Sequence, residues 1–404
     1  MKILMIYGTR PEFLKLIPVI KLMKGDNFFD LITVSTGQHK ELMEDLYEQF
    51  NFLPDIEFNV MEKNQNPSDV IVSTQILLQK IADGNEFDYI MVQGDTATVF
   101  SGALTGFLNK IPVIHVEAGM RTFDLTQPFP EEGFRQMISM ITRINYVPTE
   151  LAAKRLIYHL GHNHYTEHDK EINKDVMRKP VIKIVGNTII DTVHMVSNLI
   201  DNTNNQVFKQ YAEKNKQLIT VTLHRRENHE VIEDILKTIE HIAISNDDIK
   251  MVFPVHPNPN VKNKVHDILG NLSNVELIEP LKYFDMIHLL KETDILMTDS
   301  GGLQEEAATL NLPTIVLRET TERIEGIKNG NAIMGYTKSK YILEAMNRIL
   351  NEEGLYNKMA SSDNPYGDGQ AAQRIINHLK GDEDIPSERK GEWNEWRNKT
   401  YFWY

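Results

Sequence analysis

Carboxylates stand directly after apolar runs in this sequence. Asp95 follows the run 89–93, Glu117 ends the run 113–117, and Glu131 follows a proline-rich loop at the start of a helical pattern. Acids at strand ends are costly to keep unless they are solvated, paired or useful. If the three converge on one cleft, they form an acid/base set whose pKa values mutual repulsion can raise. Each one by itself is a helix cap or a hydrogen-bond acceptor.

Basic residues follow other apolar runs in the same way. Arg10 lies in the turn after the first run, and Lys15 lies one to two helical turns further on. A guanidinium and an ammonium near one cleft suit a diphosphate leaving group, although a solvated basic pair has the same pattern. His224 follows a later run and precedes two arginines, so it could protonate or orient a phosphate-bearing group.

A sharp corner made by Ser300, Gly301 and Gly302 turns a strand into a helix. Adjacent glycines let the backbone approach a ligand closely, and the unpaired N–H groups at the helix start favour phosphate. Glu306, one turn further on, could accept hydrogen bonds from sugar hydroxyls. Together these residues predict a nucleotide-sugar site. The alternative is a glycine-rich turn that closes an ordinary αβ unit.

A loop of mixed charge follows the last predicted strand. It contains Arg318, Glu322 and Arg323 within six residues. Such a loop either contacts the ligand or forms salt bridges between domains.

Apolar runs alternate with helical patterns, which predicts an α/β fold with two Rossmann-like domains and parallel sheets. Ligands bind outside the carboxyl ends of parallel strands, so we expect the active site in a cleft between the domains. We place the N-terminal domain at 1–195, joined by the C-terminal segment 365–404, and the C-terminal domain at 196–364. The predicted strands are 2–7, 30–35, 89–93, 113–117, 145–147, 217–223, 250–255, 275–278, 295–298 and 314–317.

Composition excludes several classes of protein. The formal net charge of −14 argues against a nucleic-acid partner, which requires a basic face. The absence of cysteine excludes disulfides and thiolate metal sites. The apolar start is too short for a signal peptide or a membrane span, so we expect a cytoplasmic protein without a membrane partner. The histidines between 158 and 179 are interpreted as part of an exposed polar insertion, and no metal site is predicted.

Eight segments in the same order resemble the bacterial non-hydrolysing UDP-N-acetylglucosamine 2-epimerase family. The resemblance covers about residues 1 to 380, including a C-terminal motif at 364–369. The eight segments are 8–12, 94–96, 115–119, 130–132, 186–188, 224–228, 300–302 and 321–323.

The resemblance implies a fold similar to GT-B glycosyltransferases, a homodimer, and interconversion of UDP-GlcNAc and UDP-ManNAc for bacterial envelope polymers. It implies no metal or redox cofactor, and a UDP-binding role for the C-terminal domain. It also implies roles for individual residues. The expected acid/base and positioning set is Asp95, Glu117, Glu131 and His224. The expected substrate-binding set is Arg10, Lys15, Ser300, Gly301, Gly302, Glu306, Arg318, Glu322 and Arg323.

The chemistry limits the mechanism independently of the resemblance. The C2 proton of an N-acetyl sugar lies next to no carbonyl group, so its direct removal would leave an unstabilised carbanion. Elimination of UDP from C1 as a base removes the C2 proton gives 2-acetamidoglucal instead, and UDP then adds back. Two acid/base groups on opposite faces and a diphosphate clamp are therefore required.

Some positions depart from the family pattern. Phe134 stands where the family usually has Asn, and Ile324 where it usually has Pro; we interpret Phe134 as packing beneath its loop. Gln38 and His39 match a motif at which many members bind a second UDP-GlcNAc as an activator. Every tryptophan lies in the tail, which suggests docking onto the first domain, a dimer partner or another protein: these are Trp393, Trp396 and Trp403.

Three alternatives to the reversible epimerase remain at this stage. A hydrolysing relative would let water trap the glycal and release free ManNAc and UDP. A non-catalytic UDP-sugar sensor or complex subunit would bind without turnover. A GT-B glycosyltransferase is disfavoured because no segment resembles an acceptor-recognition region.

Overall fold

The computed structural model describes residues 1–38, 40–61, 65–161, 180–202, 207–213, 215–225, 228, 230–381 and 400–401. The chain forms two compact units. Unit 1 comprises Met1–Thr192 and Gly367–Tyr404, and unit 2 comprises Val193–Tyr366. Unit 1 is therefore built from two separate stretches of the chain, with unit 2 inserted between them.

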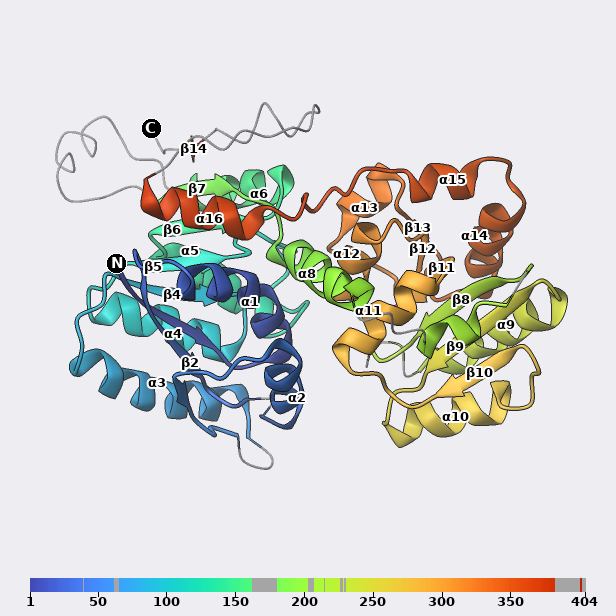
Figure 1. The fold of residues 1–404 in the computed structure, drawn as a ribbon, viewed down its shortest axis with the longest axis horizontal. Helices are drawn as coiled ribbons and strands as arrows, with labels where there is room; N and C mark the ends of the chain where they lie inside the picture. Colours follow the sequence, from blue (N-terminus) through green and yellow to red (C-terminus); the bar gives the residue numbers. More distant parts are fainter. Residues whose placement is uncertain are drawn as a thin grey trace. The chain divides into compact units, whose positions relative to one another are not determined.

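Unit 1 is organised around a sheet of order β14-β7-β6-β5-β4-β1-β2-β3 (Figure 1). All neighbouring strands are parallel except β14, which pairs antiparallel with β7. The strands are β1 (Lys2–Tyr7), β2 (Asp30–Ser35), β3 (Ile56–Glu57), β4 (Tyr89–Gln93), β5 (Val113–Val116), β6 (Ile144–Val147), β7 (Val181–Ile184) and β14 (Thr400–Tyr401). The helices are α1 (Arg10–Lys24), α2 (Lys40–Phe50), α3 (Pro67–Asp83), α4 (Ala97–Leu108), α5 (Glu131–Ile141), α6 (Glu150–Gly161) and α16 (Ala371–Lys380). A further helix, α8 (Thr188–Asn202), begins in unit 1 and continues into unit 2.

Helices cover both faces of this sheet because successive strand residues point to opposite sides. Leu4 and Ile6 of β1 join the core that includes residues of α3, α4 and α5. Tyr7 instead contacts Phe13 of α1, with ring centroids 5.5 Å apart. β1 is buried along nearly its whole length, as expected for a parallel strand covered on both faces.

Unit 2 contains a second sheet, of order β10-β9-β8-β11-β12-β13, in which every pairing is parallel. Its strands are β8 (Gln217–Thr222), β9 (Ile249–Pro254), β10 (Val275–Ile278), β11 (Ile295–Thr298), β12 (Thr314–Val316) and β13 (Ala332–Met334). Its helical elements are η1 (Val207–Tyr211), α9 (Ile232–Ser245), α10 (Pro259–Leu269), α11 (Tyr283–Glu292), α12 (Gly301–Thr309), α13 (Ile324–Asn329), α14 (Ser339–Asn351) and α15 (Leu355–Ala360).

The predicted α/β class with parallel sheets is confirmed. The prediction that Glu117 ends a strand is wrong by one residue, because β5 stops at Val116 and Glu117 has a φ of 63°. That left-handed conformation cannot continue a strand. Three further parallel strands, β3, β7 and β13, were not predicted. Two of them have only two or three residues, too few to show a pattern.

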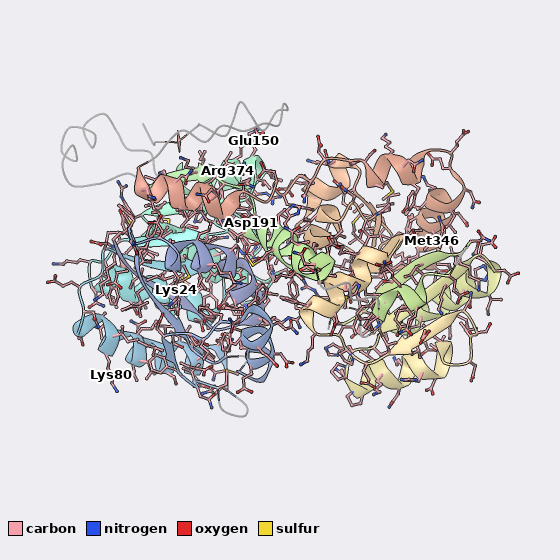
Figure 2. All side chains as sticks on the ribbon, viewed as in Figure 1. Lys24, Lys80, Glu150, Asp191, Met346 and Arg374 are labelled. Carbon is pink, nitrogen blue, oxygen red and sulfur yellow. The ribbon has the colours of Figure 1, made fainter. Side chains whose placement is uncertain are left out.

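The C-terminal stretch is fastened to unit 1 through α16. The carboxylate of Asp191 accepts hydrogen bonds from the N–H groups of Ala371 and Ala372, which begin that helix. Arg374 pairs with Asp368 at 2.6 Å and donates to the carbonyl oxygen of Val185; Asp191 and Arg374 are labelled in Figure 2. Burial raises the pKa of Asp191 to about 6 even though those N–H groups favour its ionised form.

The tail adds the two-residue strand β14, with Thr400 opposite Lys183 and Tyr401 opposite Ile182. Its backbone thus covers the edge of β7. Trp393, Trp396 and Trp403 lie outside the described residues. In the part of the chain that the structure describes, no helix combines the length and apolar character needed to cross a bilayer.

Phe134 packs in the core of unit 1, in agreement with its interpretation as a packing residue. Its side chain is 8% exposed. The ring stacks on Phe100 of α4, with centroids 5.4 Å apart and an interplanar angle of 14°. This contact joins α4 to α5, the helix that begins with Glu131.

Truncation of Phe134 therefore tests how α5 is held. We expect Phe134→Ala to lower the free energy of unfolding by about 3 kcal/mol, because it leaves a cavity beside Phe100. Urea unfolding followed by circular dichroism measures this change. Phe129→Ala is the control, since that side chain is 76% exposed. Equal effects of the two substitutions would contradict the packing role.

Candidate active site

Two predicted acids lie at one edge of the unit 1 sheet. Asp95 follows β4 and Glu117 follows β5, and these strands are parallel neighbours. The carboxyl ends of neighbouring parallel strands meet at the same edge, where ligands of doubly wound sheets bind. The structure therefore places both carboxylates where the sequence predicts a site.

Glu117 is held by donors from three elements. The Lys15 ammonium lies 2.6 Å from each of its carboxylate oxygens. Gln93 at the end of β4 also donates to it, and the Asn187 amide donates from 3.3 Å. The Glu117 side chain is only 6% exposed, and its positive φ is of the kind that clusters at functional sites. These contacts favour the ionised carboxylate, so Glu117 is equipped to accept a proton.

Asp95 is paired with an arginine that sequence reasoning missed. Arg135 of α5 donates to Asp95 Oδ2 from Nε at 2.9 Å and from Nη2 at 2.5 Å. Arg135 also lies 3.2 Å from Glu132 and is buried. The sequence contains one signal for Arg135. It lies four residues after Glu131, and residues at that spacing share one face of a helix.

Neighbouring glutamates at the start of α5 have different surroundings. Glu132 is fully buried and accepts from the backbone N–H groups of Thr122 and Phe123, so it holds the preceding loop. Glu131 is half-buried, and its carboxylate has no hydrogen-bond or ion-pair partner among the described residues. It is located one helical turn from Arg135 and so on the side of α5 that reaches Asp95.

A second buried carboxylate, Glu12, joins two loops of the site. It accepts hydrogen bonds from the Gly8 N–H and the Thr96 hydroxyl, both at 2.6 Å. The turn that carries Arg10 is thereby tied to the residue after Asp95. Gly8 also packs closely against other residues, because a Cβ there would lie 2.3 Å from Thr36 Oγ1 and 2.6 Å from Thr98 Oγ1. Burial raises the pKa of Glu12, although the hydrogen bonds oppose that shift.

His115 supports the same edge of the sheet from β5. Burial lowers its pKa to about 4, so the ring is neutral near pH 7. The ring nitrogen Nε2 lies 2.7 Å from the Gly94 carbonyl oxygen and must therefore carry the proton that it donates. Gly94 has a φ of 86°, and the hydrogen bond fixes this turn immediately before Asp95.

Gln38 and His39, the predicted second nucleotide site, can be described only in part. The Gln38 side-chain oxygen accepts from the Thr98 hydroxyl at 3.1 Å. His39 lies outside the described residues, as do His162, His164 and His168 of the histidine-rich insertion. In the described ranges, no cluster of three or more histidine or acidic residues could hold a metal ion.

In unit 2, α12 begins at the predicted glycine corner. Ser300 is its N-cap, and its hydroxyl accepts from the Leu303 N–H at 3.4 Å. A Cβ at Gly301 would lie 3.2 Å from Arg323 Nη1 and 3.4 Å from Arg225 Nη2. A Cβ at Gly302 would meet no atom within 4 Å. Two guanidinium groups thus adjoin the open start of a helix, an arrangement suited to phosphate.

Charged residues of the 318–323 loop surround this helix start. Glu322 lies 3.0 Å from Arg318 Nη1 and 3.5 Å from Arg323 Nη1. Burial alone would raise the pKa of Glu322, but Arg323, Arg318 and Arg225 together hold it at about 2. Arg323 also pairs with Glu305 of α12 at 3.0 Å. The loop therefore supplies positive charge around one ionised carboxylate.

Glu306 and His224 occupy neighbouring parts of unit 2. Glu306 is buried in α12, one and a half turns after its start. His224 lies two residues after the end of β8, and its Nδ1 lies 3.0 Å from Asp299 Oδ1. Asp299 immediately precedes Ser300, so this contact joins the segment that carries the histidine to the start of α12. Sequence reasoning did not include Asp299 in the site.

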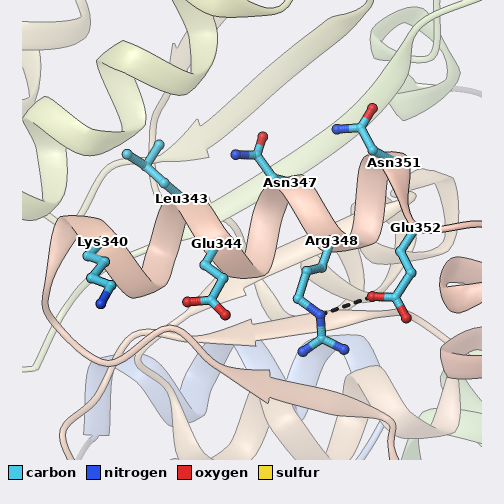
Figure 3. A pocket seen from close by; sticks show the side chains of 7 residues that line it. All are labelled: Lys340, Leu343, Glu344, Asn347, Arg348, Asn351 and Glu352. Carbon is cyan, nitrogen blue, oxygen red and sulfur yellow. Dashed lines mark hydrogen bonds and ion pairs between the residues drawn. The ribbon is translucent and has the colours of Figure 1, made fainter.

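A separate groove of about 660 Å³ runs along α14 (Figure 3). Its lining comes from that helix and from Glu352, the residue that follows it, and includes the ion pair between Arg348 and Glu352 at 3.0 Å. None of its lining residues belongs to the predicted site. We therefore assign the groove no part in the chemistry.

The two parallel sheets and the charged groups at their strand ends define a GT-B-like α/β protein. The family model for UDP-N-acetylglucosamine 2-epimerase matches residues 21–380. The UDP-N-acetylglucosamine 2-epimerase of Campylobacter jejuni is 37% identical over 388 residues, which cover 94% of this chain and 97% of that protein. The chain therefore belongs to the UDP-N-acetylglucosamine 2-epimerase family, and the expected enzyme class is confirmed.

Solved structures agree with this assignment. The Neisseria meningitidis UDP-GlcNAc 2-epimerase bound to UDP-GlcNAc superposes with a TM-score of 0.83 at 33% identity, covering 94% of this chain and 100% of that one. The Staphylococcus aureus MnaA–UDP co-structure gives a TM-score of 0.81 at 35% identity, with 94% and 96% covered.

The low pKa of Glu322 leads to a prediction about stability and pH. A fall from its ordinary value of 4.5 to about 2 corresponds to about 3 kcal/mol, since one pKa unit equals about 1.4 kcal/mol. Because the folded-state pKa is lowered, this stabilisation is present above the unfolded-state pKa and is lost as pH falls towards about 2.

We therefore expect Glu322→Gln to destabilise the protein by up to about 3 kcal/mol near neutral pH, and by progressively less below about pH 4.5. Urea unfolding at several pH values measures the difference from wild type. Glu352→Gln removes a half-exposed pair and should change stability by less than about 1 kcal/mol at every pH. A Glu322→Gln effect that does not depend on pH would contradict the electrostatic explanation.

Proposed function

We propose that the protein reversibly interconverts UDP-GlcNAc and UDP-ManNAc by elimination and readdition of UDP. The observation that carries this proposal is the Glu117 carboxylate, which Lys15, Gln93 and Asn187 hold in position for proton transfer. The complex of the Neisseria meningitidis relative with UDP-GlcNAc supports the choice of substrate. The resemblance also leads us to propose that the product supplies bacterial envelope polysaccharide.

The forward reaction begins with loss of the C2 proton to a carboxylate. The C2–H electron pair forms the C1=C2 double bond while the C1–O bond breaks, and its electrons leave with UDP. The product is 2-acetamidoglucal. In the return step UDP adds to C1, and C2 receives a proton on the opposite face. Each step is balanced without an oxidant or a metal, because only one proton and UDP are exchanged.

We assign the residues of the two units to different tasks in this reaction. Glu117, Asp95 and Glu131 serve proton transfer, and His224 serves as an acid/base or orienting group. Arg135 holds the Asp95 carboxylate through two hydrogen bonds, which limits its rotation. Arg10 and Lys15 stay in the predicted diphosphate clamp, with Lys15 linking that clamp to Glu117.

The open start of α12 serves to bind the diphosphate. Its N-terminal N–H groups and the guanidinium groups beside Gly301 provide positive potential for a leaving group that gains charge. We assign this role to Ser300, Gly301 and Gly302, with Arg318, Glu322 and Arg323 around them. Glu306 stays the proposed acceptor for the ribose hydroxyls.

Proton exchange at C2 provides the test of this mechanism. Purified protein is incubated with UDP-GlcNAc in heavy water and followed by proton NMR. We expect UDP-ManNAc with deuterium at C2, because the proton removed in elimination is replaced from solvent. Free ManNAc would instead establish a hydrolysing enzyme. Binding of UDP without any turnover would establish a sensor, and both outcomes contradict the proposal.

Asp95→Asn is the informative variant in the same experiment. We expect turnover to fall by at least about 100-fold, the usual contribution of a general acid or base, while UDP still binds. Asp83→Asn is the matched control, since Asp83 is exposed and, among the described residues, hydrogen-bonds only with Gln79 of its own helix. Equal turnover of Asp95→Asn and wild type would remove Asp95 from the catalytic set.

We further propose that the protein is a homodimer. Exposed apolar side chains lie on three helices of unit 1, of which α3 packs against α4 and α4 packs against α5. They include Val72 and Ile76 of α3, Phe107 of α4, and Met137 and Met140 of α5. A second copy would remove this apolar surface from water, which favours association.

Introducing charge on these helices tests the dimer. We expect the double substitution Ile76→Glu and Met140→Glu to weaken association by at least about tenfold, because two charges would be buried without partners. Sedimentation velocity over a range of protein concentrations measures the monomer–dimer equilibrium. Ile244→Glu, on α9 of unit 2, is the control, with a wild-type side chain that is 63% exposed. An unchanged equilibrium in the double variant would exclude this surface.

A further inference from the structure

Asp299 is a fully buried carboxylate that faces His224 and its neighbours in unit 2. Its Oδ1 lies 3.0 Å from the His224 ring nitrogen Nδ1. Its Oδ2 accepts from the backbone N–H groups of His224 and Arg225 at 3.0 and 2.9 Å, and from the Asn228 amide at 3.0 Å. One carboxylate thus fixes both the backbone turn and the ring that it carries.

The ionised state of Asp299 determines which ring nitrogen holds a proton. Burial would raise its pKa, but the His224 ring and the two backbone N–H groups lower it below the ordinary value. An ionised carboxylate can only accept hydrogen bonds. His224 Nδ1 must therefore donate to Asp299, which leaves Nε2 as the ring nitrogen available to another group.

The neighbouring histidine has a different hydrogen bond at its Nδ1. His256 stacks on His224 with ring centroids 6.4 Å apart. Its Nδ1 accepts a hydrogen bond from the Asn258 N–H at 3.2 Å, so that nitrogen has no proton. These contacts give the two stacked rings opposite tautomers.

We propose that Asp299 is a positioning residue that fixes His224 in the Nδ1–H tautomer, so that Nε2 is the atom presented to the substrate. The inference rests on the proposed function, in which His224 acts on the UDP-sugar. Asp299 also precedes Ser300, the N-cap of α12. Asp299 therefore holds His224 and the proposed diphosphate site in a fixed position relative to each other.

Replacing Asp299 by Asn gives a specific expectation for the ring. The Oδ2 position receives the Arg225 N–H, the Asn228 amide and the His224 N–H, whereas Oδ1 receives from the backbone only the His224 N–H, at 3.1 Å, so we expect the new amide oxygen at the Oδ2 position. The new amide NH₂ then faces His224 Nδ1 and can only donate. We expect Asp299→Asn to move the ring proton from Nδ1 to Nε2, to keep the hydrogen bonds that Oδ2 accepts, and to lose the one from the His224 N–H to Oδ1.

The ring tautomer is measured on the full-length protein labelled with ¹⁵N-histidine, by long-range ¹H–¹⁵N correlation NMR without substrate. The His224 signals are assigned by their loss in His224→Gln. We expect Nδ1–H in the wild type and Nε2–H in Asp299→Asn. Epimerisation by Asp299→Asn should fall by about 10²- to 10⁴-fold, the range for loss of a general acid or base, with UDP binding retained.

Asn228→Ala is the matched control. It removes one donor to the same carboxylate and a contact with the Leu317 carbonyl, but leaves the His224–Asp299 hydrogen bond. We expect this variant to lose thermal stability, to keep the Nδ1–H tautomer, and to retain most of its turnover. Loss of turnover in Asn228→Ala equal to that in Asp299→Asn would show that Asp299 has only a structural role.

Two results of the tautomer measurement overturn the inference, whether or not the proposed function holds. One is an Nε2–H tautomer in the wild type, and the other is an unchanged tautomer in Asp299→Asn. A third overturning result is wild-type turnover in Asp299→Asn despite a changed tautomer. Failure of the wild type to epimerise UDP-GlcNAc would instead contradict the proposed function and would leave the tautomer measurement valid.

Discussion

Charge compensation at the strand ends is the constraint on which the candidate site depends. A buried charge without a partner costs several kcal/mol, so an acid at this edge persists only with donors around it. Glu117 has an ammonium and two amides, Asp95 has a guanidinium, and Glu322 lies among three arginines. The groups that compensate Glu117 and Asp95 come from different elements than their carboxylates, whereas Arg318 and Arg323 share the loop of Glu322. The fold and the charges are therefore mutually dependent: helix packing brings the partners together, and the partners hold the loops.

The two units use this constraint for different purposes. Carboxylates dominate in unit 1, where buried Glu12 and Glu132 organise backbone turns and leave Asp95, Glu117 and Glu131 for chemistry. Guanidinium groups dominate in unit 2, where the open start of α12 offers N–H groups and, in the part of the chain that the structure describes, no atom lies within 4 Å of a Cβ added at Gly302. A reaction that moves a proton and releases a diphosphate needs carboxylates for the proton and guanidinium groups for the diphosphate. If the two kinds of group were interspersed, each charge would offset the other.

Much of this arrangement could be predicted from the sequence because parallel strands are buried, apolar and short. Strands such as β1 and β4 begin and end at the predicted residues, and the polar segments that follow them mark the functional edge. Arg135 and Asp299 were not predicted, since each depends on a contact between residues 40 or more positions apart. Phe134 illustrates the opposite case, because an apolar ring in a helix of amphipathic pattern already indicates packing. The catalytic roles of the site residues stay predictions, because the positions of side chains do not show that a reaction takes place.

The order of synthesis gives the discontinuity of unit 1 a further consequence. α16, whose first N–H groups donate to Asp191 and which joins the first stretch of unit 1, leaves the ribosome only after all of unit 2 has been made. Domains generally fold as units during translation. The nascent first stretch must therefore wait, with the Asp191 carboxylate lacking its helix, while a complete second domain emerges. A Cβ added at Gly367 would lie 3.4 Å from the backbone nitrogen of Asn187, the residue whose amide contacts Glu117. The packing of Gly367 beside Asn187 is thus a late event in the folding of unit 1.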